Sequence, residues 1–230
     1  MNIDLNCDMG ELDDAVHEAA LMAYITSANI ACGGHAGDAQ TMERTARLAL
    51  ERGVRIGAHP GYPDRENFGR LEIAMSPEDI ADTVYAQIAR LDEVVRRLGG
   101  AIVHVKPHGA LYNVAVHNAD VAGAIAHGVA RWNPGVTLFG LAGSPMLDVW
   151  RTMGMTVAGE AFADRRYQAD GTLRPRRFPD ALITDPHEAA AQALRSARQG
   201  LAQTICVHGD TPGSVAILQA CRSVLSDALT

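Results

Sequence analysis

Short runs rich in β-branched residues alternate with longer helical segments along the whole chain, and this alternation restricts the fold more than any other feature. We predict strands at residues 2–7, 26–31, 54–59, 101–106, 136–141, 155–160 and 203–208. The clearest helix follows Ser76, a capping residue, and keeps apolar side chains at a spacing of three or four from Ile80 to Leu98. Strands that alternate with helices in this way form a parallel sheet with crossover helices.

The predicted strands also alternate polar and apolar side chains. The pattern is clear in "DLNCD" at residues 4–8 and in "VHVK" at residues 103–106. An open parallel sheet with helices on both faces would have strands that are apolar throughout. A sheet closed on itself places helices on its outer face only, and its inner face can be polar. We therefore predict one α/β domain over residues 1–230, a TIM-like β/α barrel of seven strands.

Composition narrows the functional class. The 230 residues carry a formal charge of −7, which argues against a nucleic-acid partner. The N-terminal "MNIDLNCDMG" has neither the basic nor the apolar region of a secretory signal, and no apolar run approaches the roughly 18 residues of a membrane helix. Four cysteines without CxxC spacing are typical of reduced thiols. We therefore expect a cytoplasmic protein that does not enter membranes.

Candidate functional residues gather at the carboxyl ends of the predicted strands, where β/α barrels carry their sites. These ends supply Asn6, Asp8 and Glu11; Asn29, His35 and Asp38; His59, Asp64 and Arg70; Lys106, His108 and Asn113; Glu160, Asp164 and Arg165; and His208 and Asp210. Four histidines at four different strand ends, together with carboxylates, indicate a functional pocket. Asp38 and Asp210 each precede a helical segment, so N-capping is the alternative for these two. The irregular segments 60–75 and 161–180 are predicted to be active-site loops.

One residue in this set is unusual for the chain. Of the 20 basic side chains, 19 are arginines and the single lysine is Lys106, between His104 and His108. Lysine is a compact ammonium whose pKa changes on burial, whereas arginine is a planar fork that stays charged. We interpret Lys106 as a residue kept for its chemistry, and chance is the alternative explanation.

Several common active-site motifs are absent from the sequence. There is no GxxxxGK[ST] or GxGxxG for a nucleotide, no GxSxG elbow, and no HExxH or Cys-His zinc pattern. Asp and His residues at separate strand ends can still bind a divalent ion, as in barrel deacetylases. Spacing in the sequence leaves that question open.

Seven ordered motifs resemble the LamB/YcsF family, whose members are also called the A subunit of 5-oxoprolinase. They are "DLNCDMGE", "TSANIACGGHAGD", "GAHPGYPDRENFGR", "HVKPHGALYN", "GLAGS", "FADRRYQADGTLRPR" and "TICVHGDTPG". The resemblance implies a barrel of the glycoside hydrolase/deacetylase type. It also implies a bacterial cytoplasmic enzyme component that acts with partner subunits B and C in the ATP-dependent opening of 5-oxoproline (pyroglutamate) to L-glutamate. The segment "LDDAVHEA", the short "RQGLAQ" before Thr204 and the arginine-rich "PRRFPDALI" depart from the family pattern. The second of these departures is expected to alter a partner or homo-oligomer surface.

This resemblance suggests roles for the strand-end residues. Because the chain has no nucleotide motif, ATP is expected to be used by the complex. We expect Lys106 to neutralise a phosphate or an oxyanion, and a general base to be provided by Asp8, His35 or His59. The remaining candidates are predicted to bind the substrate: Asn6, Asn29, Arg70, His108, Glu160 and His208. One alternative is a metal-dependent amide hydrolase or deacetylase that acts alone, and another is a non-catalytic protein that binds 5-oxoproline and delivers it to its partners.

Overall fold

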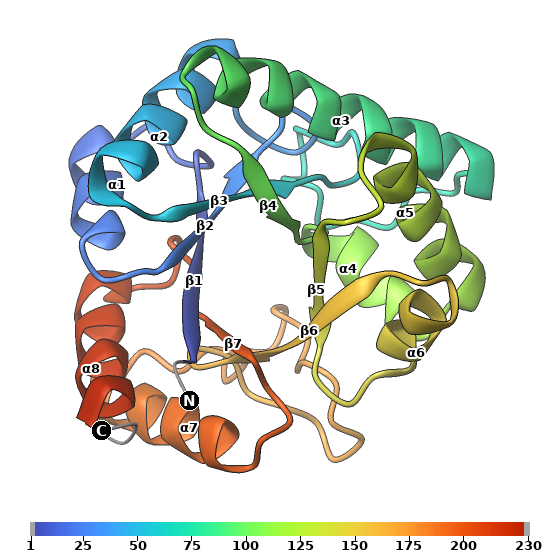
Figure 1. Cartoon of the computed structure of the whole chain (residues 1–230). Helices are drawn as coiled ribbons and strands as arrows, with labels where there is room; N and C mark the ends of the chain where they lie inside the picture. Colours follow the sequence, from blue (N-terminus) through green and yellow to red (C-terminus); the bar gives the residue numbers. More distant parts are fainter. Residues whose placement is uncertain (1–2, 228–230) are drawn as a thin grey trace.

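Seven parallel strands form a closed barrel surrounded by helices in the computed structural model, which describes residues 3–227 (Figure 1). The strands are β1 (Asp4–Met9), β2 (Ser27–Ala31), β3 (Arg55–His59), β4 (Ile102–Val105), β5 (Thr137–Leu141), β6 (Thr156–Phe162) and β7 (Thr204–Cys206). The predicted seven-stranded β/α barrel is confirmed. Each predicted strand overlaps an observed one, and residue 2 of the first prediction lies outside the described residues.

Closure of the barrel comes from the pairing of β1 with β7, which aligns Asn6 with Cys206. On the other side of β1, Asp8 aligns with Asn29 of β2. Polar side chains that are far apart in the sequence therefore lie side by side inside the barrel. Their hydrogen bonds to one another stabilise an interior that the alternating pattern predicts to be polar.

The helices on the outside bury one apolar face each. They are α1 (Ala15–Met22), α2 (Ala39–Arg52), α3 (Pro77–Arg97), α4 (Gly109–Ala115), α5 (Ala119–Trp132), α6 (Pro145–Thr152), α7 (Pro186–Arg198) and α8 (Ser214–Asp227). Ser76 caps α3 as predicted, because its hydroxyl accepts a hydrogen bond from the amide of Asp79. Ile88 of α3 is fully buried, and so are Leu5 and Ile30 on the outer face of the barrel. Within residues 3–227 no helix is both long and apolar enough to span a bilayer.

One close contact inside the barrel depends on a glycine. His104 on β4 donates a hydrogen bond from Nε2 to Asn29 Oδ1 at 2.8 Å, and its ring stacks on Phe139 with 4.2 Å between ring centroids. A Cβ atom on Gly57 of β3 would lie 2.0 Å from that Nε2. The absence of a side chain at residue 57 therefore provides the space for the His104 ring.

Candidate functional site

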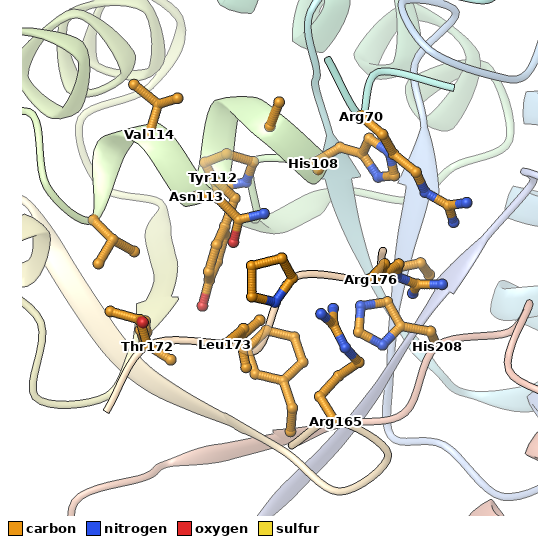
Figure 2. A pocket seen from close by; sticks show the side chains of 18 of the residues that line it. Arg70, His108, Tyr112, Asn113, Val114, Arg165, Thr172, Leu173, Arg176 and His208 are labelled. Atoms are coloured by element: carbon orange, nitrogen blue, oxygen red, sulfur yellow. The ribbon is translucent and has the colours of Figure 1, made fainter. Parts of the chain in front are cut away.

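A cavity of about 690 Å³ opens at the carboxyl ends of the strands, where the sequence predicts the site (Figure 2). Six of the predicted site residues line it: Asp8, His59, Arg70, Lys106, His108 and His208. Residues from both predicted loops line it as well, among them Leu71 and Arg165. The other four predicted residues, Asn6, Asn29, His35 and Glu160, are buried behind the lining and contact it. Direct contact of these four with a substrate stays a prediction.

Lys106 is buried beneath the cavity among acceptors. Its Nζ lies 2.8 Å from Asp8 Oδ1, 3.0 Å from Glu160 Oε1 and 3.0 Å from Cys206 Sγ. Burial alone would lower the pKa of Lys106, but Asp8, Cys206 and Glu160 raise it well above its ordinary 10.5. The ammonium is therefore charged, and each of its three N–H groups has an acceptor.

Asp8 is the carboxylate most directly coupled to this ammonium. It accepts hydrogen bonds from Lys106 and, at 2.8 Å, from Asn29 Nδ2, while its Oδ2 lies 3.4 Å from His59 Nε2. Burial alone would raise the pKa of Asp8, but His59 and Lys106 hold it well below its ordinary 3.8. Asp8 is thus an ionised carboxylate at the floor of the cavity.

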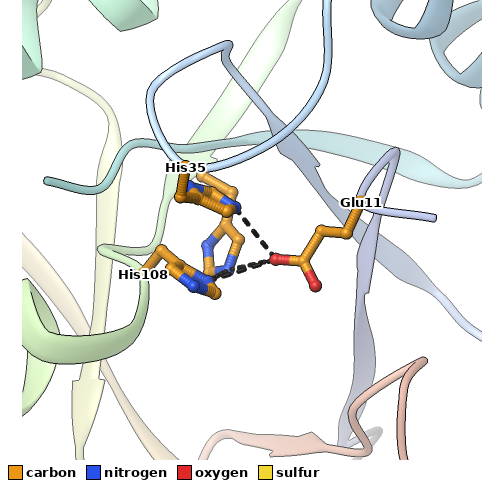
Figure 3. A group of neighbouring side chains, drawn as sticks. Glu11, His35 and His108 are labelled. Carbon is orange, nitrogen blue, oxygen red and sulfur yellow. Dashed lines mark hydrogen bonds and ion pairs between the residues drawn. The ribbon is translucent and has the colours of Figure 1, made fainter. Parts of the chain in front are cut away.

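Three histidines and Glu11 meet beside Asp8 (Figure 3). Glu11 Oε1 lies 3.0 Å from His35 Nε2, 3.1 Å from His108 Nδ1 and 3.6 Å from His59 Nε2. Burial lowers the pKa of His35 to about 3 and also lowers the pKa of His108. Burial would raise the pKa of Glu11, but His108 and His35 keep it well below 4.5. One potential ligand atom from each of these four residues lies within 4.8 Å of all the others, so the group could hold a metal ion.

An unusual backbone conformation supports this cluster. Phe68 has a φ of 56°, the only positive value for a non-glycine residue between residues 3 and 227. An aromatic residue in the left-handed region is strained, and such strain persists where the surrounding structure requires it. The carbonyl of Phe68 accepts a hydrogen bond from His108 Nε2 at 2.8 Å. The turn therefore fixes the orientation of the His108 ring.

Basic side chains line one side of the cavity. Figure 2 shows Arg70, Arg176 and His208 there, with Tyr112 and Val114 on the opposite side. Arg176 contacts Asp210 through two hydrogen bonds of 3.0 and 3.2 Å, and Arg70 pairs with the same carboxylate.

The two residues with a capping alternative differ in the structure. Asp38 is an N-cap, because its side chain accepts from the amide of Thr41. Asp210 instead lies before α8, which begins at Ser214, and pairs with the arginines of the cavity wall. Only Asp210 therefore belongs to the site.

Three residues that shape this site have no role predicted from the sequence. Glu11 stands at a strand end, three residues after Asp8 in the same motif, and that proximity is the signal that points to it. Arg176 belongs to the predicted loop 161–180, which has four arginines beyond Arg165, and the sequence does not indicate that Arg176 and Arg177 are the two that line the cavity. Cys206 is typical of a buried thiol, and only the pairing of β1 with β7 brings it to Lys106.

Comparisons with known proteins agree with this geometry. The sequence model of the LamB/YcsF family matches residues 3–230. The chain belongs to the LamB/YcsF family. A relative from Chloroflexus aggregans, named as the A subunit of 5-oxoprolinase, is 48% identical over 243 residues, which cover 99% of this chain and 96% of the relative.

Solved structures show the same architecture. The lactam utilization protein from Thermus thermophilus is 39% identical to this family member, with a TM-score of 0.91 over 99% of this chain and 97% of that one. The catalytic domain of a peptidoglycan N-acetylglucosamine deacetylase from Eubacterium rectale is 9% identical, with a TM-score of 0.53 over 98% of this chain and 84% of that one. The deacetylase shares the barrel fold alone.

Proposed function

We propose that this chain is the A subunit of an ATP-dependent 5-oxoprolinase, which opens 5-oxoproline to L-glutamate together with partner subunits B and C. The names of its full-length relatives support the substrate. The single structural observation that carries the proposal is a cavity with arginines on one side and an ionised carboxylate beside histidines at its floor. Such a cavity suits a small anion that undergoes hydrolysis.

The two polar ends of 5-oxoproline match the two parts of the cavity. Its carboxylate pairs with the arginine side, where the guanidinium of Arg176 has two of its five N–H donors on Asp210 and has others left for a second carboxylate. Its lactam group then extends toward Asp8 and His59. A cavity of about 690 Å³ is within the range of small-molecule sites and has room for more than this small ring.

Ring opening requires activation of the lactam, because resonance stabilises the amide bond. In the proposed reaction ATP transfers its γ-phosphoryl group to the lactam oxygen, which makes the ring carbon electrophilic and yields ADP. Water adds to that carbon, the C–N bond breaks, the nitrogen takes up a proton, and a second water releases phosphate. Asp8 or His59 accepts the proton of the attacking water. We do not propose His35 as the general base, because it does not line the cavity.

Lys106 has a more indirect part in this proposal than its sequence position suggests. Its N–H groups already face Asp8, Glu160 and Cys206. We therefore propose that Lys106 keeps Asp8 ionised, and that its positive charge acts on the reacting centre through that carboxylate. Lys106→Arg is expected to lose activity, because a guanidinium does not fit in the space of the ammonium.

Glutamate release from 5-oxoproline tests the proposal. The chain is assayed with and without subunits B and C and with and without ATP, and release is expected only from the full mixture. Asp8→Asn is expected to reduce turnover at least about 100-fold, in line with loss of a general base. Asp148→Asn is the matched control, because Asp148 is exposed on α6 and forms an ion pair with Arg151 on the surface.

The other outcomes point to the alternatives. Release by this chain alone would contradict dependence on the complex and favour a free-standing amide hydrolase. Normal turnover of the Asp8→Asn complex, with 5-oxoproline still bound, would favour a protein that only delivers the substrate to its partners.

A further inference from the structure

We propose that Glu11, His59 and His108 bind one divalent transition-metal ion of the Zn²⁺ type at the floor of the cavity. The three residues follow three different strands, β1, β3 and β4, and the barrel brings their ligand atoms together. The site does not depend on the proposed function, because it involves only an ion and the side chains of this chain. With an ion on His59 Nε2 and a hydrogen on Nδ1, His59 has no free ring nitrogen, so Asp8 is then the general base of the proposed reaction.

The orientation of His59 leaves one ring nitrogen without a proton. Its Nδ1 lies 2.7 Å from the carbonyl oxygen of Lys106. A carbonyl oxygen can only accept, so Nδ1 carries the hydrogen and donates it. In a neutral ring Nε2 then has a lone pair, which faces His108 and the carboxylates of Asp8 and Glu11.

His108 is arranged in the same way with its nitrogens exchanged. Its Nε2 donates to the carbonyl of Phe68, so Nδ1 is left with a lone pair. This Nδ1 lies 3.0 Å from His59 Nε2 and 3.1 Å from Glu11 Oε1. Two lone pairs and a carboxylate therefore face one another in a buried place, and the His59 and His108 rings, when neutral, supply no hydrogen between their facing nitrogens. Such a group of acceptors is stable only around a positive charge.

The separations of these atoms suit one metal ion. The sides of the triangle formed by Glu11 Oε1, His59 Nε2 and His108 Nδ1 are 3.0, 3.1 and 3.6 Å. Atoms so placed lie on a circle of about 1.9 Å radius, so one ion can be about 2.1 Å from each, the usual length of a Zn–N or Zn–O bond.

The surroundings of the three residues have the form expected around a metal. Histidine ligands commonly donate their second ring N–H to a backbone carbonyl or a carboxylate, and both His59 and His108 do so here. His35 stacks on His108 with 3.6 Å between ring centroids and contacts Glu11 through Nε2. Its Nδ1 is buried and has no hydrogen-bond partner among the described residues. His35 is thus a positioning residue for Glu11 and His108.

The proposed ion would face the cavity, because Glu11, His59 and His108 all belong to its lining. Two histidines and one glutamate with an open position form a ligand set of catalytic zinc sites, which activate water or polarise a carbonyl. The second group with suitable distances consists of Asp8, Cys206 and His208. The Lys106 ammonium contacts both Asp8 and Cys206, so a cation already neutralises that group.

Metal binding by the chelator-treated chain tests the proposal. Calorimetric titration with Zn²⁺ is expected to show one tight site per chain. X-ray absorption of the loaded protein is expected to show a nitrogen and oxygen shell at about 2.0–2.1 Å and no sulfur at about 2.3 Å. Glu11→Gln is expected to weaken binding by more than about tenfold, since even residues behind the ligands contribute about that much. His127→Ala, at an exposed histidine of α5, is the control and is expected to bind Zn²⁺ like the natural chain.

Three results would overturn the inference. The first is the absence of saturable Zn²⁺ binding to the natural chain, which would leave a proton as the charge between His59 and His108. The second is a sulfur shell around the bound metal, and the third is an unchanged Zn²⁺ affinity in Glu11→Gln. The first two results are measured on the natural chain, so these two tests remain valid even if the variant does not fold. None of them depends on glutamate release, so failure of the proposed enzyme activity would leave this test intact.

Discussion

Replacing Lys106 by methionine should destabilise the fold strongly, because it leaves buried carboxylates without their cation. Lys106 is 2% exposed, and its partners Asp8 and Glu160 are 5% and 0% exposed. Methionine has nearly the length of lysine, so the change removes charge with little change in volume. Removing one partner of a buried ion pair costs about 3–5 kcal/mol in the free energy of unfolding. For a chain of this size that corresponds to a decrease of about 6–20 °C in Tm.

The pH dependence of this loss follows from the pKa shifts. Asp8 has a lowered pKa in the folded protein, so its contribution to stability is present above its ordinary 3.8 and disappears as the pH falls through the folded value. Lys106 has a raised pKa, so its contribution is present below 10.5 and disappears as the pH rises through the folded value. The difference between the natural chain and Lys106→Met should therefore be largest near neutral pH. It should shrink in mild acid, because burial without the Lys106 ammonium raises the pKa of Asp8 in the variant, and protonation of Asp8 there removes the uncompensated charge.

Urea and thermal unfolding at pH 7 and pH 4.5, in buffer with a chelator, measure this difference. The control is Arg47→Met, which removes an exposed ion pair of 2.9 Å with Glu43 on α2 and should change stability by less than about 0.5 kcal/mol. Equal stability of Lys106→Met and the natural chain at pH 7 would refute the reasoning. A loss that is the same at both pH values would show that it arises from packing and not from charge.

Two further predictions concern packing and substrate binding. Gly57→Ala should lower the free energy of unfolding by about 1–3 kcal/mol in a urea titration, because its Cβ would displace the His104 ring. The control is Gly123→Ala on α5, which should be neutral or stabilising because its Cβ would meet nothing closer than 3.9 Å. Arg176→Met should raise the KM for 5-oxoproline about 10- to 100-fold, as expected for loss of a charged hydrogen bond, and Arg131→Met on the outer surface should not. Equal stability of the two glycine variants, or an unchanged KM, would contradict these interpretations.

Local patterns in the sequence were sufficient to predict the barrel and the place of its site. Periods of two and of three to four residues are set by neighbouring residues, so they indicate strands, helices and a polar inner face without knowledge of contacts. The segment 76–98 and the alternating residues 4–8 are examples, and both occur in the structure as predicted. Six of the ten predicted site residues line the cavity for the same reason, since strand ends meet on one side of a parallel barrel.

The partners of each side chain depended on the tertiary structure. Lys106 meets Cys206 across 100 residues of sequence only because β7 closes the barrel against β1. Glu11 becomes the centre of the histidine cluster because the loop after β1 turns toward β3 and β4, and no local pattern indicates that direction. The protonated nitrogen of each ring is likewise selected by the carbonyls of Lys106 and Phe68. The sequence by itself determined which chemical groups reach the end of the barrel, and the register and closure of the sheet decided which of them touch, because contacts between distant segments arise only when the whole barrel forms.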